Sequence, residues 1–159
     1  MVENHKRPSW DEYFMNIMDA VASRATCDRG RSGAVIVKDK RIICTGYVGA
    51  PKGLPHCDEV GHLFKRAIKS DGTETQNCVR TTHAEMNAIV QAALHGVALK
   101  DSTLYCRMEP CLDCAKAIIS AGIRRVVCQS RYKDAELTRD FFKQAGVELT
   151  VLNDEIAKY

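Results

Sequence analysis

The chain has 159 residues and a formal net charge of +3, with lysines and arginines interspersed among the acidic residues. This length predicts a single domain over residues 1–159, and the absence of a basic stripe argues against a polynucleotide partner. No apolar run approaches the length of a membrane span, and the polar segment 1–8 lacks the apolar centre of a signal peptide, so we expect no membrane partner and a cytoplasmic location.

The first part of the chain predicts a helix followed by a β-hairpin. Residues 9–12 form a Ser-Trp-Asp-Glu capping box, and apolar residues recur behind it at helical spacing. We therefore expect a helix from about Trp10 to Arg24. Residues 33–38 and 41–47 are rich in β-branched and aromatic residues and are separated by two polar residues, which predicts an antiparallel hairpin.

Residues 48–82 form a loop-rich insertion with one helical candidate near 59–69. Insertions of this length inside a compact domain are usually functional or braced by a metal. After the insertion, helices and strands alternate, and each helix is followed by a glycine. The expected elements are a helix at 83–95, a strand at 103–107, a helix at 111–121, a strand at 125–129, a helix at 135–145 and a strand at 147–152. This order predicts an α/β fold, a mixed sheet covered by helices on both faces.

Two short motifs, His-Ala-Glu and Pro-Cys-Leu-Asp-Cys, carry the chemistry of the second half. Neutral imidazole and two thiolates, from His83, Cys111 and Cys114, form a Cys2His ligand set for zinc. Three protein ligands leave one corner of the tetrahedron for water, which zinc acidifies. Glu85 is then placed to move protons as general base and general acid. The alternative is a closed structural zinc site in which Glu85 is merely exposed.

The combined pattern His-x-Glu and Pro-Cys-x-x-Cys is the signature of zinc-dependent nucleobase deaminases. From about Trp10 to Leu152 the chain resembles the deoxycytidylate (dCMP) deaminases of the cytidine deaminase superfamily, including bacterial competence-operon proteins of that type. The resemblance rests on the runs Gly-Ala-Val-Ile-Val-Lys-Asp, Gly-Tyr-Val-Gly-Ala-Pro, Gly-Leu-Pro-His-Cys, His-Ala-Glu-Met-Asn-Ala-Ile and Pro-Cys-Leu-Asp-Cys-Ala-Lys. The zinc motif identifies only the superfamily, whereas the Gly-Tyr-x-Gly-x-Pro run and the long insertion point to dCMP.

The resemblance implies the hydrolysis of dCMP to dUMP and ammonia, which feeds dTMP synthesis. One catalytic Zn²⁺ would be held by His83, Cys111 and Cys114, with Glu85 as the proton shuttle. The implied fold is three-layered, α/β/α, around a five-stranded mixed sheet. The implied assembly is a homo-oligomer, usually a hexamer, whose activity dCTP raises and dTTP lowers. The alternatives are another deaminase of the superfamily, acting on cytidine, cytosine, guanine or a tRNA adenosine, and a nucleotide-sensing accessory protein.

Candidate substrate contacts lie beside the zinc motifs. Backbone groups at Ala84 and Glu109 adjoin the ligands, and Tyr132 is either a wall of the pocket or an aromatic residue of a surface loop. Val48 stands where many family members have an asparagine that is expected to contact the sugar. Arg107 replaces a commonly small or neutral residue and either binds phosphate or pairs with Glu109. A phosphate group requires cations, for which the candidates are Arg29, Arg31, Lys52 and Arg107.

The eight cysteines divide by their surroundings. Apart from the two zinc ligands, three lie in apolar runs and are expected in the core: Cys44, Cys106 and Cys128. The other three, Cys27, Cys57 and Cys78, frame the insertion, where some members of the resembled family carry an extra zinc. We predict a second, structural Zn²⁺ on these thiols, with His56 or His62 as the fourth ligand. The alternative is three free thiols, or a disulfide, which a reducing cytosol disfavours.

Overall fold

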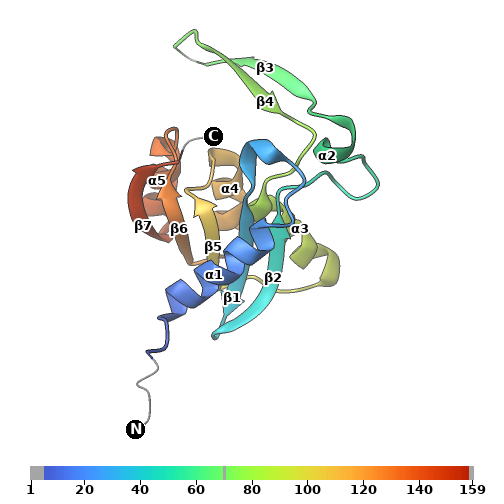
Figure 1. Cartoon of the computed structure of the whole chain (residues 1–159). Helices are drawn as coiled ribbons and strands as arrows, with labels where there is room; N and C mark the ends of the chain where they lie inside the picture. Colours follow the sequence, from blue (N-terminus) through green and yellow to red (C-terminus); the bar gives the residue numbers. More distant parts are fainter. Residues whose placement is uncertain (1–5, 70, 158–159) are drawn as a thin grey trace.

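The computed structural model describes residues 6–69 and 71–157 and is built on a five-stranded sheet with the strand order β2-β1-β5-β6-β7 (Figure 1). The strands are β1 (Gly33–Lys38), β2 (Arg41–Tyr47), β5 (Thr103–Met108), β6 (Arg125–Arg131) and β7 (Glu148–Ile156). Strand β1 is antiparallel to both β2 and β5, whereas β5, β6 and β7 run parallel. The predicted mixed sheet of five strands is confirmed.

Helices cover both faces of this sheet, which confirms the three-layer prediction. On one face, α1 (Trp10–Ala22) packs through Phe14 and Met18 against Val35 and Val127. The other face is covered by three helices, α3 (Ala84–His95), α4 (Leu112–Ser120) and α5 (Glu136–Ala145). The alternation of side chains along each strand produces the two cores, since neighbouring residues of β1 point to opposite faces. The predicted helices and the strands outside the insertion are confirmed to within a few residues.

Glycines allow two helices to approach the sheet very closely. A Cβ atom added at Gly46 of β2 would lie 2.4 Å from the backbone nitrogen of Ala88 and 2.5 Å from the carbonyl oxygen of Ala84. A Cβ atom at Gly33 of β1 would likewise lie 2.7 Å from the backbone of α1. Such distances are shorter than van der Waals contact, so only glycine fits at these positions. Gly46 thereby holds the first turns of α3 directly against β2.

The insertion differs from its prediction. The helix expected near 59–69 is wrong: α2 (Cys57–Val60) is a single turn, and β3 (Phe64–Ile68) pairs with β4 (Glu74–Cys78) as an antiparallel hairpin. This hairpin extends away from the main sheet (Figure 1). Gly72, at φ 82°, and Asp71, which accepts the backbone N–H of Thr73 at 2.9 Å, turn the chain between the two strands. Within the described residues, no helix has both the length and the apolar character of a membrane span.

Candidate active site

The two zinc motifs meet at the N-termini of α3 and α4. His83 is the N-cap of α3, while Cys111 is the N-cap of α4 and Cys114 lies in its first turn. Pro110 directly precedes the N-cap Cys111 and is not part of α4. The positive end of each helix dipole faces the same point, which favours thiolates there.

The three candidate ligands have the spacing of a metal site. The Sγ atoms of Cys111 and Cys114 lie 3.4 Å and 3.6 Å from Nδ1 of His83. All three donor atoms lie within 4.8 Å of one another. Bond lengths of about 2.0 Å to nitrogen and about 2.3 Å to sulfur place tetrahedral zinc ligands roughly 3.5–3.8 Å apart. A borderline-soft Cys2His donor set at this spacing therefore fits zinc.

Glu85 lies beside these ligands in a buried position. It is 7% exposed, and its Oε2 atom is 4.0 Å from Sγ of Cys114. This burial contradicts the alternative in which Glu85 is merely exposed. Burial raises the pKa of the Glu85 carboxyl, and the neighbouring His83 opposes that rise. A carboxyl group whose pKa is raised by burial is better able to hold a proton and pass it on.

The thiol and imidazole groups of the site shift the pKa values of one another. Hydrogen bonds from Cys114 and His83, working against burial, lower the pKa of Cys111 to about 4. The same contact with Cys111 raises the pKa of His83 to about 9. Cys111 is thus favoured as a thiolate, the ligand form that a metal ion requires, whereas the contact with Cys111 and burial raise the pKa of Cys114, whose thiol would lose its proton on binding a metal.

Glu109 carries a fully buried carboxylate immediately before the second motif. It accepts hydrogen bonds from Nε and Nη2 of Arg139, both at 2.7 Å, and from Nη1 of Arg131 at 3.2 Å. The backbone N–H of Tyr132 donates to it at 2.9 Å. Burial opposes its ionisation, but the bonds from Arg139 and Tyr132 hold the pKa of Glu109 below its ordinary value.

Arg107 does not take the expected place beside Glu109. Its guanidinium donates to the backbone carbonyl of Arg31 and lies 3.7 Å from the carboxylate of Asp19. The alternative that Arg107 pairs with Glu109 is therefore wrong, and its role as a phosphate ligand stays a prediction. Arg107 and Arg31 nevertheless lie together, at the end of β5 and just before β1.

The remaining sequence candidates are distributed around the site. Ala84 is the first residue of α3 and is buried, and Val48 is 8% exposed and belongs to the core. Arg29 binds the hairpin. Its Nη2 donates to the carbonyl of Gln76 at 3.3 Å, and its guanidinium lies 5.0 Å from the centre of the Phe64 ring. Lys52 lies in an exposed turn of the insertion.

Tyr132 is half-buried and directly follows β6. Burial, and then the charges of Asp134 and Cys111, raise the pKa of Tyr132. Asp134 in turn forms a 2.9 Å ion pair with Lys69, which follows β3. Sequence reasoning missed Lys69, Asp134, Arg131 and Arg139, because their partners are distant in the chain and no local pattern marks them.

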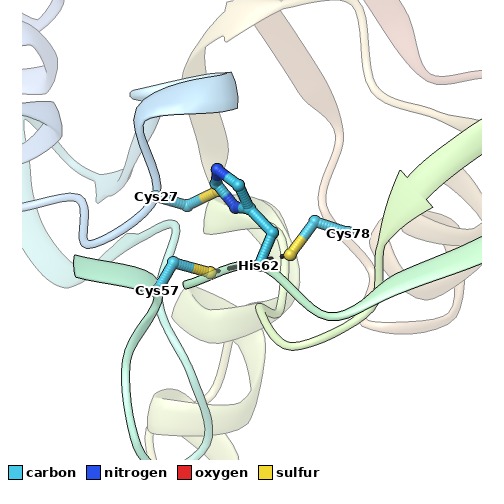
Figure 2. A group of neighbouring side chains, drawn as sticks. All are labelled: Cys27, Cys57, His62 and Cys78. Atoms are coloured by element: carbon cyan, nitrogen blue, oxygen red, sulfur yellow. Dashed lines mark hydrogen bonds between the residues drawn. The ribbon is translucent and has the colours of Figure 1, made fainter. Parts of the chain in front are cut away.

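A second cluster of metal-type ligands lies at the base of the hairpin. Figure 2 shows Cys27, Cys57, His62 and Cys78 pointing toward one another, and their donor atoms lie within 4.8 Å of one another. Sγ of Cys27 is 3.7 Å from Nδ1 of His62, and the Sγ atoms of Cys57 and Cys78 are 3.6 Å apart. This separation is far longer than a disulfide bond of about 2.05 Å. The thiols are free, so the disulfide alternative is contradicted.

The structure distinguishes the two histidines that were candidates for this cluster. His62 lies within it, whereas Nδ1 of His56 is 3.0 Å from Oγ1 of Thr26 and is not part of the group. Burial opposes ionisation of Cys78, but the backbone N–H groups of Arg80 and Leu63 lower the pKa of Cys78 to about 6. One thiolate is therefore available to bind a metal near neutral pH.

A mixed sheet between helices, with a Cys2His set at two helix N-termini and a buried glutamate beside it, defines a zinc-dependent deaminase of the cytidine deaminase type. The family described as "Cytidine and deoxycytidylate deaminase zinc-binding region" matches residues 8–130. Together with the relatives below, this match places the chain in the deoxycytidylate deaminase family of the cytidine deaminase superfamily.

Relatives and a solved structure agree with this family. ComE operon protein 2 of Bacillus subtilis is 41% identical over 142 residues, which cover 89% of this chain and 70% of that protein. Deoxycytidylate deaminase of Schizosaccharomyces pombe is 38% identical over 146 residues, covering 92% of this chain but only 45% of that protein. The dCMP deaminase of cyanophage S-TIM5, solved in complex with dCMP and dUMP, superposes with a TM-score of 0.73 at 30% identity, covering 92% and 99% of the two chains. These relatives confirm the resemblance to the dCMP deaminases, including the bacterial competence-operon proteins of that type.

Proposed function

We propose that this chain hydrolyses dCMP to dUMP and ammonia. The observation that carries the proposal is the buried carboxylate of Glu85, 4.0 Å from Sγ of Cys114 in the Cys2His site. A site that only binds a nucleotide has no chemical need for a proton carrier at this position. The likeness to a dCMP deaminase solved with its substrate and product supports the choice of substrate.

Each residue of the site has a distinct task in this reaction. His83, Cys111 and Cys114 would hold the zinc ion, which, when bound, supplies a polarised water molecule. Glu85 accepts the two protons of the attacking water one after the other, and passes the first to the ring nitrogen and the second to the leaving amino group. The C–O bond from water forms first, and the C–N bond breaks once the amino group is protonated, so the products are dUMP and ammonia. Burial of Glu85 keeps these protons from exchanging with bulk water.

Recognition of the nucleotide falls to residues around this centre. We propose that the backbone at Ala84 and Glu109 contacts the base and that Tyr132 forms a wall of the pocket. The carboxylate of Glu109 is already occupied by Arg131 and Arg139, so only its backbone would meet the base. Arg31 and Arg107 are the proposed phosphate ligands, because guanidinium groups bind phosphate with charge-assisted hydrogen bonds.

The substrate proposal is tested by ammonia release from dCMP, dCTP, deoxycytidine, cytidine, cytosine and guanine in parallel. We expect kcat/KM for dCMP to exceed that for deoxycytidine by about tenfold or more, since the nucleoside cannot replace the phosphate contacts. Equal values for the two would contradict the phosphate contacts, and turnover of another substrate in preference to dCMP would contradict the assignment. Release from none of them would favour the nucleotide-sensing alternative.

The wider role of the enzyme is also a proposal. Family membership supports a homo-oligomer, a hexamer in the usual case, with activity raised by dCTP and lowered by dTTP. It also supports a cytoplasmic role in which the dUMP supplies dTMP synthesis. Adding dCTP or dTTP to the dCMP assay tests the effectors, because an unchanged rate at every dCMP concentration would contradict them.

We further propose that Cys27, Cys57, His62 and Cys78 bind a second zinc ion. Four donors, of which three are thiols, within 4.8 Å fit a closed structural site. The segment that they join includes the exposed strands β3 and β4, which bury little apolar surface of their own. A metal at this point would offset the entropy lost when the hairpin is ordered.

Elemental analysis tests the second site. We expect about two zinc ions per chain in the wild type and about one in Cys57→Ser, with faster hydrogen exchange in β3 and β4. Cys44→Ser is the matched control, because Cys44 is also a free thiol but lies outside both clusters. A ratio near one in the wild type, unchanged in Cys57→Ser, would contradict the site.

A further inference from the structure

Glu109 makes an unusually complete set of contacts for a side chain next to a metal-ligand motif. Its side chain is 0% exposed, and its two oxygens are shared among Arg139, Arg131 and the backbone N–H of Tyr132. A buried carboxylate is tolerated only when charges and hydrogen bonds replace the lost water. Glu109 meets this requirement entirely from one neighbouring region, the end of β6 and the start of α5.

These contacts join the ligand segment to the loop that follows β6. Beyond the side-chain bonds, the backbone N–H of Glu109 donates to the carbonyl of Ser130 at 3.1 Å. The carbonyl of Pro110 accepts a bond from Oγ1 of Thr138 at 3.0 Å. The two residues before Cys111 are therefore fixed to the same loop and helix, and Glu109 binds the backbone N–H of Tyr132 directly.

The bond to the Tyr132 amide distinguishes Glu109 from an ordinary ion pair. An arginine–carboxylate pair alone would join two elements without fixing the loop between them. Because one oxygen also accepts the Tyr132 N–H, the carboxylate determines where the backbone of Tyr132 lies relative to Cys111. Tyr132 is half-buried, and its backbone is one hydrogen bond away from a residue that lies two positions before Cys111, so a displaced backbone would move the ring relative to the metal ligands.

We propose that Glu109 is a positioning residue, which holds Tyr132 in place beside the metal ligands and thereby sets the affinity for the nucleotide. Its carboxylate would act through Tyr132 and not by direct contact, because Arg131, Arg139 and the Tyr132 amide already bind it. This inference rests on the proposed function insofar as the nucleotide is dCMP. Its structural part, that the Glu109 carboxylate fixes the Tyr132 loop, does not depend on the substrate.

The chain offers a matched control for this proposal at the other end of β6. There, Asp11 binds Nη1 and Nη2 of Arg125 at 2.9 Å and 2.8 Å and accepts the hydroxyl of Tyr105 at 2.8 Å. Glu109→Gln and Asp11→Asn each remove one charge from a bidentate arginine pair. Both variants are expected to lower the midpoint of thermal unfolding, but only Glu109→Gln should affect the nucleotide site.

We expect Glu109→Gln to change KM, which a loss of folding stability alone would not do. In Glu109→Gln, KM for dCMP should rise about tenfold and up to about 100-fold, with a smaller change in kcat, because a displaced positioning group weakens binding. Zinc per chain should equal that of the wild type. Asp11→Asn should keep the wild-type KM. If Glu109→Gln does not fold, Arg139→Lys removes the bidentate fork while Glu109 keeps Arg131, and the same rise in KM is expected.

A double-mutant cycle with Tyr132 decides whether Glu109 acts through this residue. Tyr132→Ala should raise KM by itself, and adding Glu109→Gln should raise it no further, since the two changes remove one interaction. Additive effects, or an unchanged KM in Glu109→Gln, would overturn the proposal.

Hydrogen exchange of the Tyr132 amide separates this proposal from the assignment of the substrate. Exchange should be faster in Glu109→Gln than in Asp11→Asn, whatever the substrate proves to be. Equal exchange would overturn the positioning role, whereas absence of dCMP turnover in the wild type would overturn only the proposed function.

Discussion

At the scale of single residues, the reaction centre depends on where a few ionisable groups are buried. Glu85 is 7% exposed, and burial raises the pKa of its carboxyl. Glu109, which is also buried, has the opposite surroundings, because Arg131 and Arg139 hold it ionised. Their neighbours thus give these two glutamates opposite surroundings, which fit the separate tasks that we propose, one to carry protons and one to hold structure.

Replacing Glu85 by glutamine tests its task as proton carrier. The amide keeps the shape of the side chain but cannot accept or deliver a proton, so turnover of dCMP should fall by at least roughly 10²–10⁴-fold. Zinc per chain should stay at the wild-type value, because Glu85 is not one of the ligands. Near-normal turnover in the zinc-loaded variant would contradict the mechanism.

At the scale of elements, local patterns predicted most of the structure and failed in the insertion. The capping box at Ser9, which receives the Glu12 N–H at 3.2 Å, and the glycines after α3 and α5 marked the helix ends correctly. The segment at Phe64–Ile68 has a spacing of apolar residues that also fits a helix, but its residues are exposed and pair with β4. The Asp71-Gly72 dipeptide was the available hairpin signal, since this pair favours a tight turn between strands.

The contact between β2 and α3 can be tested through Gly46. Gly46→Ala should destabilise the fold by about 1–3 kcal/mol or more, because the added Cβ meets the backbone of α3 and not a movable side chain. Urea unfolding measures this loss. Since α3 carries His83 and Glu85, the folded fraction should also lose zinc and activity.

Gly33→Ala is the control for this change. Its added Cβ meets the backbone of α1, 2.7 Å from the carbonyl oxygen of Met18, so it should cost similar stability without moving the metal ligands. Full activity in the folded fraction of Gly46→Ala would show that the start of α3 tolerates displacement and would contradict the argument.

At the scale of the whole molecule, the sequence predicted the sheet and the ligand set but not the contacts between distant segments. His83, Cys111 and Cys114 could be proposed together because the motif combines chemistry with spacing. The ion pairs of Glu109 with Arg139 and of Lys69 with Asp134 depend on tertiary packing, so no local sequence pattern predicts them. Val48 is buried in the core, which accounts for an apolar residue at that position. A single deaminase domain over residues 1–159 stays a prediction.

The exposed surface of α3 bears on the assembly of the chain. Val90 and Leu94 lie one helical turn apart on α3 and are 51% and 69% exposed, although α3 otherwise packs against the sheet. Exposed apolar side chains grouped on one helix favour contact with another copy of the chain, and homo-oligomers bury such surfaces symmetrically. We therefore expect light scattering to give a mass of several chains, and Leu94→Glu to lower that mass. Leu137→Glu, at a position 57% exposed on α5, is the matched control and should leave the mass unchanged. A wild-type mass of one chain would contradict the oligomer, and a mass unaffected by Leu94→Glu would place the contact on another surface.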